Sequence, residues 1–187
     1  PQVQLPVDFA GQPVLHDAAV VNGEVVLLVE SSPGQCTDPN TCFGSVWAIW
    51  PDRSTGTKLD EQIVWEAGYS QLSLSATGVV VGMKSAEVSS SPWSVAIPGA
   101  TAAPIDPVAI GLEVDYIDCS TCPTALTMDG TGRFVGWMQR NVDGTATIVV
   151  KRVVDGVTLA YGIADPSKLP AFGSLDIGRL ADDGSGV

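Results

Sequence analysis

Short apolar runs separated by turns make up most of this sequence. Val, Ile, Thr and aromatic residues cluster or alternate in these runs, as in 24–30 (EVVLLVE), 79–84 (VVVGMK) and 133–139 (RFVGWMQ). Such alternation, with β-branched residues, is typical of strands. No segment sustains the helical period, and the prolines of 165–172 restrict that best helix candidate to a turn. The pattern predicts an all-β protein.

The strand pattern recurs along the chain. Four segments join an apolar or small lead-in to a turn ending in glycine and, where the chain continues, to an apolar run. The turn glycines lie 55, 54 and 54 residues apart, at Gly23, Gly78, Gly132 and Gly186. Gly, Asn and Asp adopt the positive φ that tight turns need, so each unit is predicted to begin with a hairpin.

Two further strands are expected in each complete unit. The third strands are predicted at 45–51, 92–99 and 145–152, and less regular fourth strands at 62–68, 111–118 and 156–163. About nine extra residues precede the third strand of the first unit, and they include the segment CTDPNTC. Four-stranded units at this period are typical of propeller blades. We therefore expect about three and a half antiparallel blades of ~54 residues: a strand or linker at 1–17, blades at 18–70, 71–124 and 125–173, and the start of a fourth at 174–187.

The hairpin segments resemble a known kind of repeat. LTMDGTGRFVGW at 126–137 and RLADDGSGV at 179–187 are similar to the PD40 repeats of TolB-like β-propellers. The resemblance covers most of residues 18–187 and implies blades rather than a particular activity. The first two units depart from the Asp-Gly pattern, with Asn22-Gly23 and Thr77-Gly78.

The number of units predicts a larger ring or assembly. Propellers close with four to eight blades, because closure removes unpaired sheet edges. The chain opens without an initiator Met and stops where a second strand of the fourth unit should start. We expect it to be part of a longer chain; alternatively, other copies or other chains supply the missing blades.

Composition and charge narrow the classes of partner. Hydrophobic residues make up 45% of the chain and charged residues 16%, which excludes a disordered acidic tail. No apolar run has the length needed to span a bilayer, so no membrane insertion is expected. The net charge of -12 opposes nucleic acid and anionic membranes. Protein or glycan remains the expected partner.

Four cysteines lie in two close pairs within turn-rich segments. They are Cys36 and Cys42 in CTDPNTC, and Cys119 and Cys122 in CSTC. The spacing leaves three connectivities open. Two local disulfides in an extracellular or periplasmic protein are the favoured interpretation, and they would restrain the loops. A four-thiolate zinc site and free or redox thiols are the alternatives.

One end of the expected blades gathers candidate ligand groups. If strands run outward from the axis, both cysteine pairs lie on the face formed by the second-to-third and fourth-to-first connections. Oxygen ligands suited to Ca²⁺ lie beside them in the sequence, so calcium is a possible ligand of this face, although no cofactor is expected. Solvated surface charge is the simpler explanation of these residues, which are Asp38, Asn40, Asp115 and Asp118.

Tryptophans offer a second candidate feature. Their rings suit the apolar faces of sugars, but Trp47, Trp93 and Trp137 fall within predicted strands, where packing between blades explains them. Trp50 and Trp65 are expected to be exposed and complete the candidate ligand face.

Support for catalysis is thin. His16 is the single histidine, it lies outside the repeats, and no G-x-S-x-G nucleophile motif occurs. No catalytic residue is assigned, and the chain is more readily interpreted as a non-enzyme. The sequence favours an extracellular non-catalytic propeller module that acts as a binding or structural scaffold. The alternatives are a protomer that completes its blades with other chains, as a ring or filament, and the propeller portion of a secreted hydrolase or lyase.

Overall fold

The fold is all-β, as the sequence predicts. The computed structural model describes residues 4–32, 43–63, 68–86, 89–113, 116–117, 123–140 and 145–164. Within these ranges the chain forms strands β1 to β12, and the one helical element is the 3-10 helix η2 (Pro51–Arg53). No helix in the described ranges is long and apolar enough to cross a membrane.

The first sheet is a four-stranded antiparallel meander. Its strands are β1 (Gln12–Val21), β2 (Glu24–Ser32), β3 (Phe43–Trp50) and β4 (Thr55–Ile63), hydrogen-bonded in that order. The helix η2 turns the chain between β3 and β4, and Ser54 ends it in the left-handed region at φ 49°.

The second sheet repeats this order. It consists of β5 (Gly68–Leu74), β6 (Val79–Ala86), β7 (Ser89–Ala96) and the two-residue β8 (Tyr116–Ile117).

The third sheet follows the same plan. It consists of β9 (Pro123–Met128), β10 (Phe134–Arg140), β11 (Ala146–Arg152) and β12 (Thr158–Ala164).

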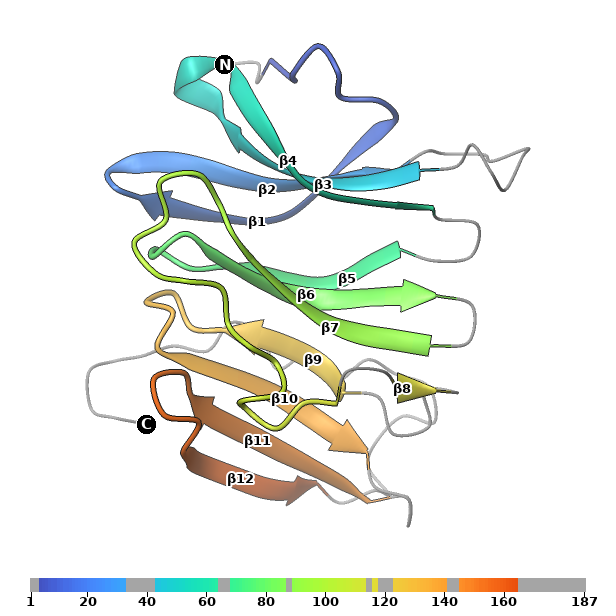
Figure 1. Cartoon of the computed structure of the whole chain (residues 1–187), viewed down its shortest axis with the longest axis vertical. Helices are drawn as coiled ribbons and strands as arrows, with labels where there is room; N and C mark the ends of the chain where they lie inside the picture. Colours follow the sequence, from blue (N-terminus) through green and yellow to red (C-terminus); the bar gives the residue numbers. More distant parts are fainter. Residues whose placement is uncertain are drawn as a thin grey trace.

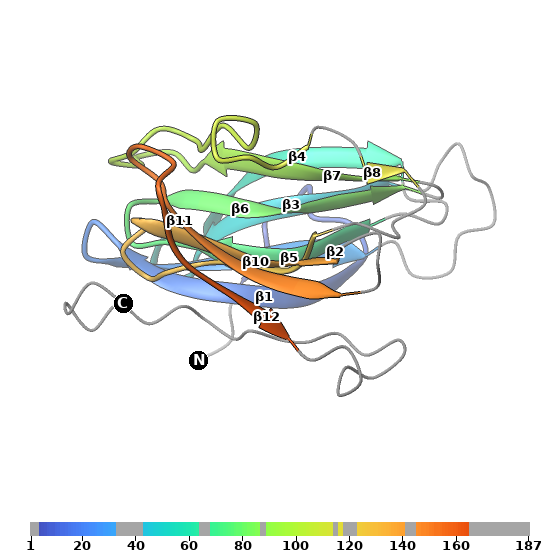
Figure 2. The ribbon, with the colours of Figure 1, turned by 90° about the horizontal axis from the view of Figure 1, so that it is seen from below.

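The three sheets stack face to face in chain order (Figure 1). The first strands are neighbours across the stack, since β1 contacts β5 and β5 contacts β9. Seen from below, β1 and β5 lie toward one side of the stack and β4, β7 and β8 lie on the opposite side (Figure 2). The first two sheets are therefore arranged as propeller blades are, with the first strand innermost.

The second sheet is buried on both of its faces. Successive strand residues point to opposite faces, so Val80 packs toward the first sheet while Val79, Val81 and Met83 pack toward the third. This explains why VVVGM is apolar without alternation. Two cores result. The first joins sheets one and two, and its largest contributions come from Leu28, Trp50, Tyr69, Leu72 and Leu74. The second joins sheets two and three and includes Leu126, Met128 and Trp137, with Ile105, Ile110 and Leu112 from the β7–β8 connection.

The turn glycines Gly23, Gly78 and Gly132 all join a first strand to a second. Each has a positive φ, of 82°, 82° and 76°. The first turn is nevertheless tighter, because Val21 pairs directly with Glu24 and both central residues, including Asn22 at φ 51°, are left-handed. This is the type I′ geometry of two-residue hairpins.

The second and third turns are longer and are closed by a buried polar side chain. Asp129, 1% exposed, accepts hydrogen bonds from the backbone N–H groups of Phe134 at 2.7 Å and Thr131 at 3.0 Å. Ser75 occupies the corresponding position and accepts one from Val79 N–H at 3.2 Å. The carboxylate of Asp129 thus caps the backbone of its turn.

A β-bulge recurs at the same place in every first strand. The register with the second strand shifts between Leu15 and Asp17, between Ser70 and Ser73, and opposite residues 136–138 in the third sheet. The inserted residue falls at His16, at Gln71 or Leu72, and at 125 or 126, in each case six to seven positions before the turn glycine. The bulge is thus part of the repeat.

The expected unit boundaries need correction. The divisions after residues 17, 70 and 124 fall inside β1, β5 and β9. The first strands start upstream of their apolar lead-ins. Their opening residues are partly polar and exposed, as in β1, so the apolar pattern does not mark where these strands begin. Residues 4–11 contain no strand, and Phe9 from this segment packs on Trp47 with ring centroids 5.6 Å apart.

Two of the expected fourth strands also differ. The strand expected at 62–68 is β4 (Thr55–Ile63), which begins directly after η2 and has the polar sequence TGTKLDEQI. Of the strand expected at 111–118, the structure describes β8 (Tyr116–Ile117) and residues 111–113, which form no strand and include the core residue Leu112. The strand expected at 156–163 is confirmed as β12.

Candidate functional site

The bulge in β1 directs two consecutive side chains toward the second sheet. His16 Nε2 lies 2.7 Å from Oε2 of Glu30 on β2, and both side chains are mostly buried. Asp17 accepts a hydrogen bond from the backbone N–H of Leu74 on β5 at 2.8 Å. In a regular strand, neighbouring residues would face opposite sides. The bulge therefore assembles a polar group on the seam between the first two sheets.

A second polar group continues this seam. Tyr69 on β5 donates its hydroxyl hydrogen to Oδ2 of Asp60 on β4 at 2.9 Å, and Nζ of Lys84 on β6 lies 2.5 Å from the same oxygen. The ring of Trp93 lies 5.5 Å below Nζ of Lys84 and 5.9 Å from the ring of Tyr69. Burial, followed by the hydrogen bond to Asp60, raises the pKa of Tyr69 far above its usual range.

The contacts among Tyr69, Asp60 and Lys84 favour a structural role that connects the two sheets, rather than acid–base chemistry. The phenol of Tyr69 is held protonated, so it serves as a donor and not as a base. Asp60 is shared between that phenol and the ammonium of Lys84. Within the described ranges, no group of three or more His, Cys, Asp or Glu side chains is placed to hold a metal ion.

At the opposite end of the same seam lies a polar groove of about 550 Å³. Arg53 from η2 forms an ion pair with Glu24 from β2. Nε of Arg53 lies 2.7 Å from Oε1 of Glu24, and Nη2 of Arg53 contacts Oε2. The side-chain amide of Asn22 donates to the carbonyl of Gly99 at 2.7 Å and so ties the first sheet to the β7–β8 connection. The groove is completed by Val21, Trp50, Thr55, Thr57 and Pro98.

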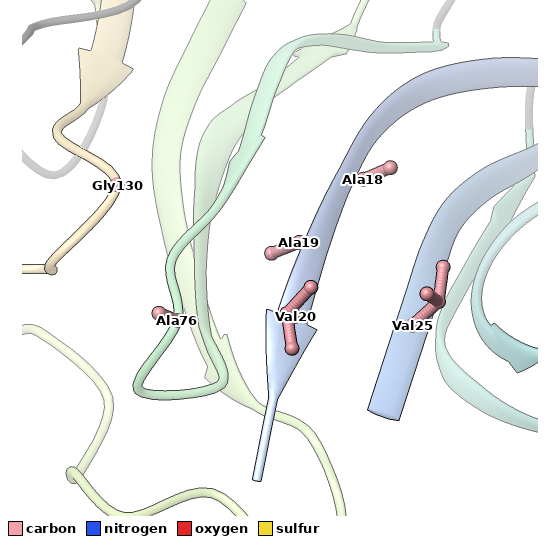
Figure 3. Close-up of a pocket in the computed structure, with 6 residues that line it drawn as sticks. All are labelled: Ala18, Ala19, Val20, Val25, Ala76 and Gly130. Carbon is pink, nitrogen blue, oxygen red and sulfur yellow. The ribbon is translucent and has the colours of Figure 1, made fainter. Parts of the chain in front are cut away.

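Near the turns on the inner side of the stack lies a more apolar hollow of about 390 Å³ (Figure 3). It is lined by Ala18, Ala19, Val20, Val25, Ala76 and Gly130, which come from β1, β2 and the turns of the second and third sheets. Val20 and Val25 are 58% and 42% exposed, and Leu15 further along β1 is 62% exposed. The first sheet thus presents an uncovered apolar strip, defined here by Leu15, Val20 and Val25.

A third hollow, of about 510 Å³, lies on the face of the third sheet that points toward the second. Lys151, Thr158 and Glu113 reach it, and Trp137 forms part of its wall. Trp137 is only 3% exposed and offers no open ring face.

The structure corrects one member of the candidate ligand face. Trp50 is 8% exposed and packs in the core between the first two sheets, because it is the last residue of β3 on the face toward the second sheet. Trp137 is buried between the second and third sheets, as expected, and Trp93 is partly buried against the first core. Trp47 is buried, but with Val29, Ile49 and Phe9 and not between two sheets.

Several predicted residues lie outside the described ranges. They are the cysteines Cys36, Cys42, Cys119 and Cys122, the oxygen-bearing residues Asp38, Asn40, Asp115 and Asp118, and Trp65 and Gly186. The disulfide, zinc and calcium hypotheses for these residues stay predictions.

Apart from the single histidine, the polar residues between the first two sheets carry no mark in the sequence that predicts their contacts. The pairing of His16 with Glu30 depends on a bulge that leaves no mark in the apolar pattern. Thr55 and Thr57 did carry a signal, because residues two apart in a strand share a face. The predicted strands at 45–51 and 62–68, however, leave residues 55–57 in the connection between them.

The comparisons with known proteins concern the fold. No protein-family model and no curated protein sequence matches this chain. The structure resembles acylaminoacyl peptidase from Pyrococcus horikoshii, with a TM-score of 0.51 and 9% identity over 84% of this chain and 26% of that one. It also resembles the β-propeller domain of the Trilobed protease from Pyrococcus furiosus, with a TM-score of 0.49 and 9% identity over 83% of this chain and 44% of that one.

The chain therefore spans less than half the length of these solved structures. At such low identity the likeness extends to architecture only. Three stacked four-stranded antiparallel sheets in chain order are the arrangement of propeller blades, so the chain has the architecture of a partial β-propeller.

Proposed function

We propose that this chain is a set of blades from a larger β-propeller that acts outside the cell as a non-catalytic binding or structural scaffold. Its units are proposed to be of the TolB-like PD40 kind, a proposal supported by the buried Asp129 in the turn of LTMDGTGRF. Its partner is proposed to be a protein or a glycan.

One comparison among three valines carries the proposal of a larger propeller. Val25, Val80 and Val135 are each the second residue of the second strand in their sheets. Val80 and Val135 are buried, at 0% and 1% exposure, against the preceding sheet in the stack. Val25 points to the corresponding side of the first sheet and is 42% exposed. A monomer rarely leaves such a strip uncovered, so we infer that a further sheet covers it.

Chemical labelling of the protein expressed from its complete gene tests this proposal. The variant Val25→Cys is compared with Val154→Cys, whose parent side chain is 83% exposed. Peptide mapping after maleimide treatment separates both sites from the four natural cysteines. If a sheet covers the strip, position 25 should react at least about tenfold more slowly, since labelling then requires local opening. Equal rates at the two positions would overturn the proposal.

Light scattering on the same protein separates the sources of the covering sheet. A mass well above 19.4 kDa that persists under denaturing conditions indicates a longer chain. A mass that falls to that of the single chain on denaturation indicates other copies, as in a ring or filament.

A hydrolase remains the second candidate, favoured by the peptidases among the structures that share the fold. Under that hypothesis this chain is the propeller portion, with the reacting groups elsewhere. Labelling of the intact protein by a serine-directed fluorophosphonate would support it and contradict the non-catalytic proposal. The extracellular assignment is tested separately by thiol counting under denaturing conditions, where two disulfides leave no free thiol.

A further inference from the structure

The groove lined by Glu24, Arg53, Thr57 and Trp50 combines polar and apolar surface without net charge. Its one acidic and one basic side chain form a pair with each other. Both are partly exposed, at 36% and 57%, so their outer hydrogen-bonding positions face solvent. A guanidinium has five N–H donors and a carboxylate accepts at several positions, so pairing leaves capacity on both partners.

Hydroxyl groups add to this capacity along one side of the groove. Thr55 pairs with Trp50 and Thr57 with Ala48 across the β3–β4 ladder, so both threonines lie on the face toward the second sheet. Each hydroxyl can donate and accept. Val21, Trp50 and Pro98 supply the apolar part of the lining.

These properties select among ligand classes. An anion is disfavoured by the net charge of -12 and finds an arginine that is already paired. A metal cation is disfavoured because Glu24 is the one carboxylate of the groove lining and is bound to Arg53. A purely apolar ligand would leave the paired charges and hydroxyls without solvent. A neutral ligand with many hydroxyl groups satisfies all of these positions, because adjacent hydroxyls can donate to the carboxylate and accept from the guanidinium.

We propose that this groove is a binding site for a neutral saccharide. The volume of about 550 Å³ is within the range of small-ligand sites. The sugar hydroxyls bond Glu24, Arg53 and Thr57, while the carbon face of the ring contacts the apolar part of the lining. Because Trp50 is mostly buried, it contributes an edge rather than a stacking platform.

The site is preorganised by contacts that do not involve the ligand. Asn22 is tied to Gly99, and Thr101 N–H bonds the carbonyl of Thr77 at 2.8 Å, which fixes the connection opposite β4. Both walls therefore hold their positions before a ligand arrives, which reduces the entropy lost on binding.

Saturation-transfer NMR on the full chain tests the proposal. The probes are the methyl glycosides of glucose, galactose, mannose and N-acetylglucosamine, with N-acetylneuraminic acid as an anionic comparison. At least one neutral glycoside should receive saturation. Its dissociation constant should rise about three- to tenfold in Thr57→Val and in Glu24→Gln, as expected for loss of one hydrogen bond.

Two matched variants serve as controls. Thr127→Val makes the same change at a partly buried strand position outside the groove, and Glu61→Gln breaks an exposed pair with Lys58. Both should bind the glycoside as the parent chain does. The proposal is overturned if no neutral glycoside responds, if the acidic sugar responds more strongly, or if groove and control variants bind equally.

This inference rests on the proposed binding role and narrows its glycan alternative to one site. The two can fail separately, because the labelling test at position 25 concerns the opposite face of the first sheet. Slow labelling without saccharide binding would retain the larger propeller and remove the groove as a sugar site.

Discussion

Asp17 on β1 and Leu74 on β5 are joined by a hydrogen bond in which the backbone N–H of Leu74 donates to Oδ2 of the carboxylate at 2.8 Å. The other oxygen of Asp17 accepts from the N–H of Ala18 at 2.7 Å. The inner strands of the first two sheets are therefore connected by one side chain. In the next pair of sheets, Gln71 accepts from Leu126 N–H at 2.6 Å. Both acceptors sit at the bulge of their strand.

Removal of the Asp17 carboxylate should destabilise the stack. Asp17→Ala leaves the N–H of Leu74 without this acceptor in a partly buried place, which costs about 1–3 kcal/mol. Asp8→Ala, at an exposed position, should change the free energy of unfolding by less than about 0.5 kcal/mol. Urea unfolding of both variants, followed by circular dichroism, measures the difference. Equal midpoints would contradict the connecting role of Asp17.

The turn between β9 and β10 contains two glycines with different requirements. Gly132 has φ 76°, and a Cβ there would lie 2.7 Å from Oγ1 of Thr77. Gly132→Ala should therefore cost about 1–3 kcal/mol. Gly130→Ala is the control, because a Cβ at Gly130 meets nothing within 4 Å and its φ is not left-handed. Thermal unfolding of the two variants should separate them clearly, and a similar melting temperature for both would rule out this account of the turn.

The buried carboxylate of Asp129 should matter more than the hydroxyl at the equivalent turn. Asp129→Ala removes the acceptor for the N–H groups of Phe134 and Thr131 and should cost about 2–4 kcal/mol. Ser75→Ala removes a single neutral acceptor for Val79 N–H and should cost about 1 kcal/mol. Guanidinium unfolding measures both losses, and the reverse order would show that the two turns are not closed in the same way.

Alkaline pH should weaken the seam at Tyr69. Its pKa is raised in the folded state, chiefly by burial and then by the hydrogen bond to Asp60, whereas the unfolded chain ionises near the ordinary value. The folded state thus binds the proton more tightly, so the contribution of Tyr69 to stability should be complete below about pH 10 and should be lost as the pH rises above it.

The variant Tyr69→Phe tests this dependence. It should be less stable at neutral pH because the bond to Asp60 is lost, but its stability should decline less steeply in alkali. The free energy of unfolding by urea, measured at a series of pH values, gives both slopes. Parallel curves for the two proteins would mean that Tyr69 does not hold its proton in the folded state.

The repeat was predictable because it depends on local chemistry. Gly23, Gly78 and Gly132 mark the turns in the sequence, and the apolar runs that follow them form the second strands. The third strands are equally visible, because each contains a short run rich in apolar residues, as in SVWAIW of β3 and ATIVV of β11. These features arise from residues close together in the chain, which a single sequence displays.

The outer strands were harder to locate because they carry little apolar signal. β4 consists mostly of polar residues at the edge of its sheet, and the short turn at Pro51–Arg53 that starts it gives no Gly-based mark. The apolar residues within 62–68 therefore led to the prediction of the fourth strand there instead of at β4. In the second sheet, the described residues 111–113 form no strand, and Leu112 among them packs in the core.

The seam depends on relationships between distant residues. The bulge at His16 depends on the register of β1 against β2 and on the contact of Asp17 with β5. The residues around it therefore show no special pattern in the sequence. For the same reason Trp50 was expected at the surface. It ends its strand and precedes a proline, yet the second sheet covers it.

The bonds at the bulges have one further consequence. On the donating side each uses only main-chain N–H groups, at Leu74 and at Leu126, which nearly any residue type provides. On the accepting side a single polar side chain suffices, and Asp17 and Gln71 show that its identity can vary. A duplicated unit would thus keep the hydrogen bonds to the sheets on either side of it, and the residues at its other positions could change in sequence. Divergent units that still stack are the expected evolutionary product of such hydrogen bonds.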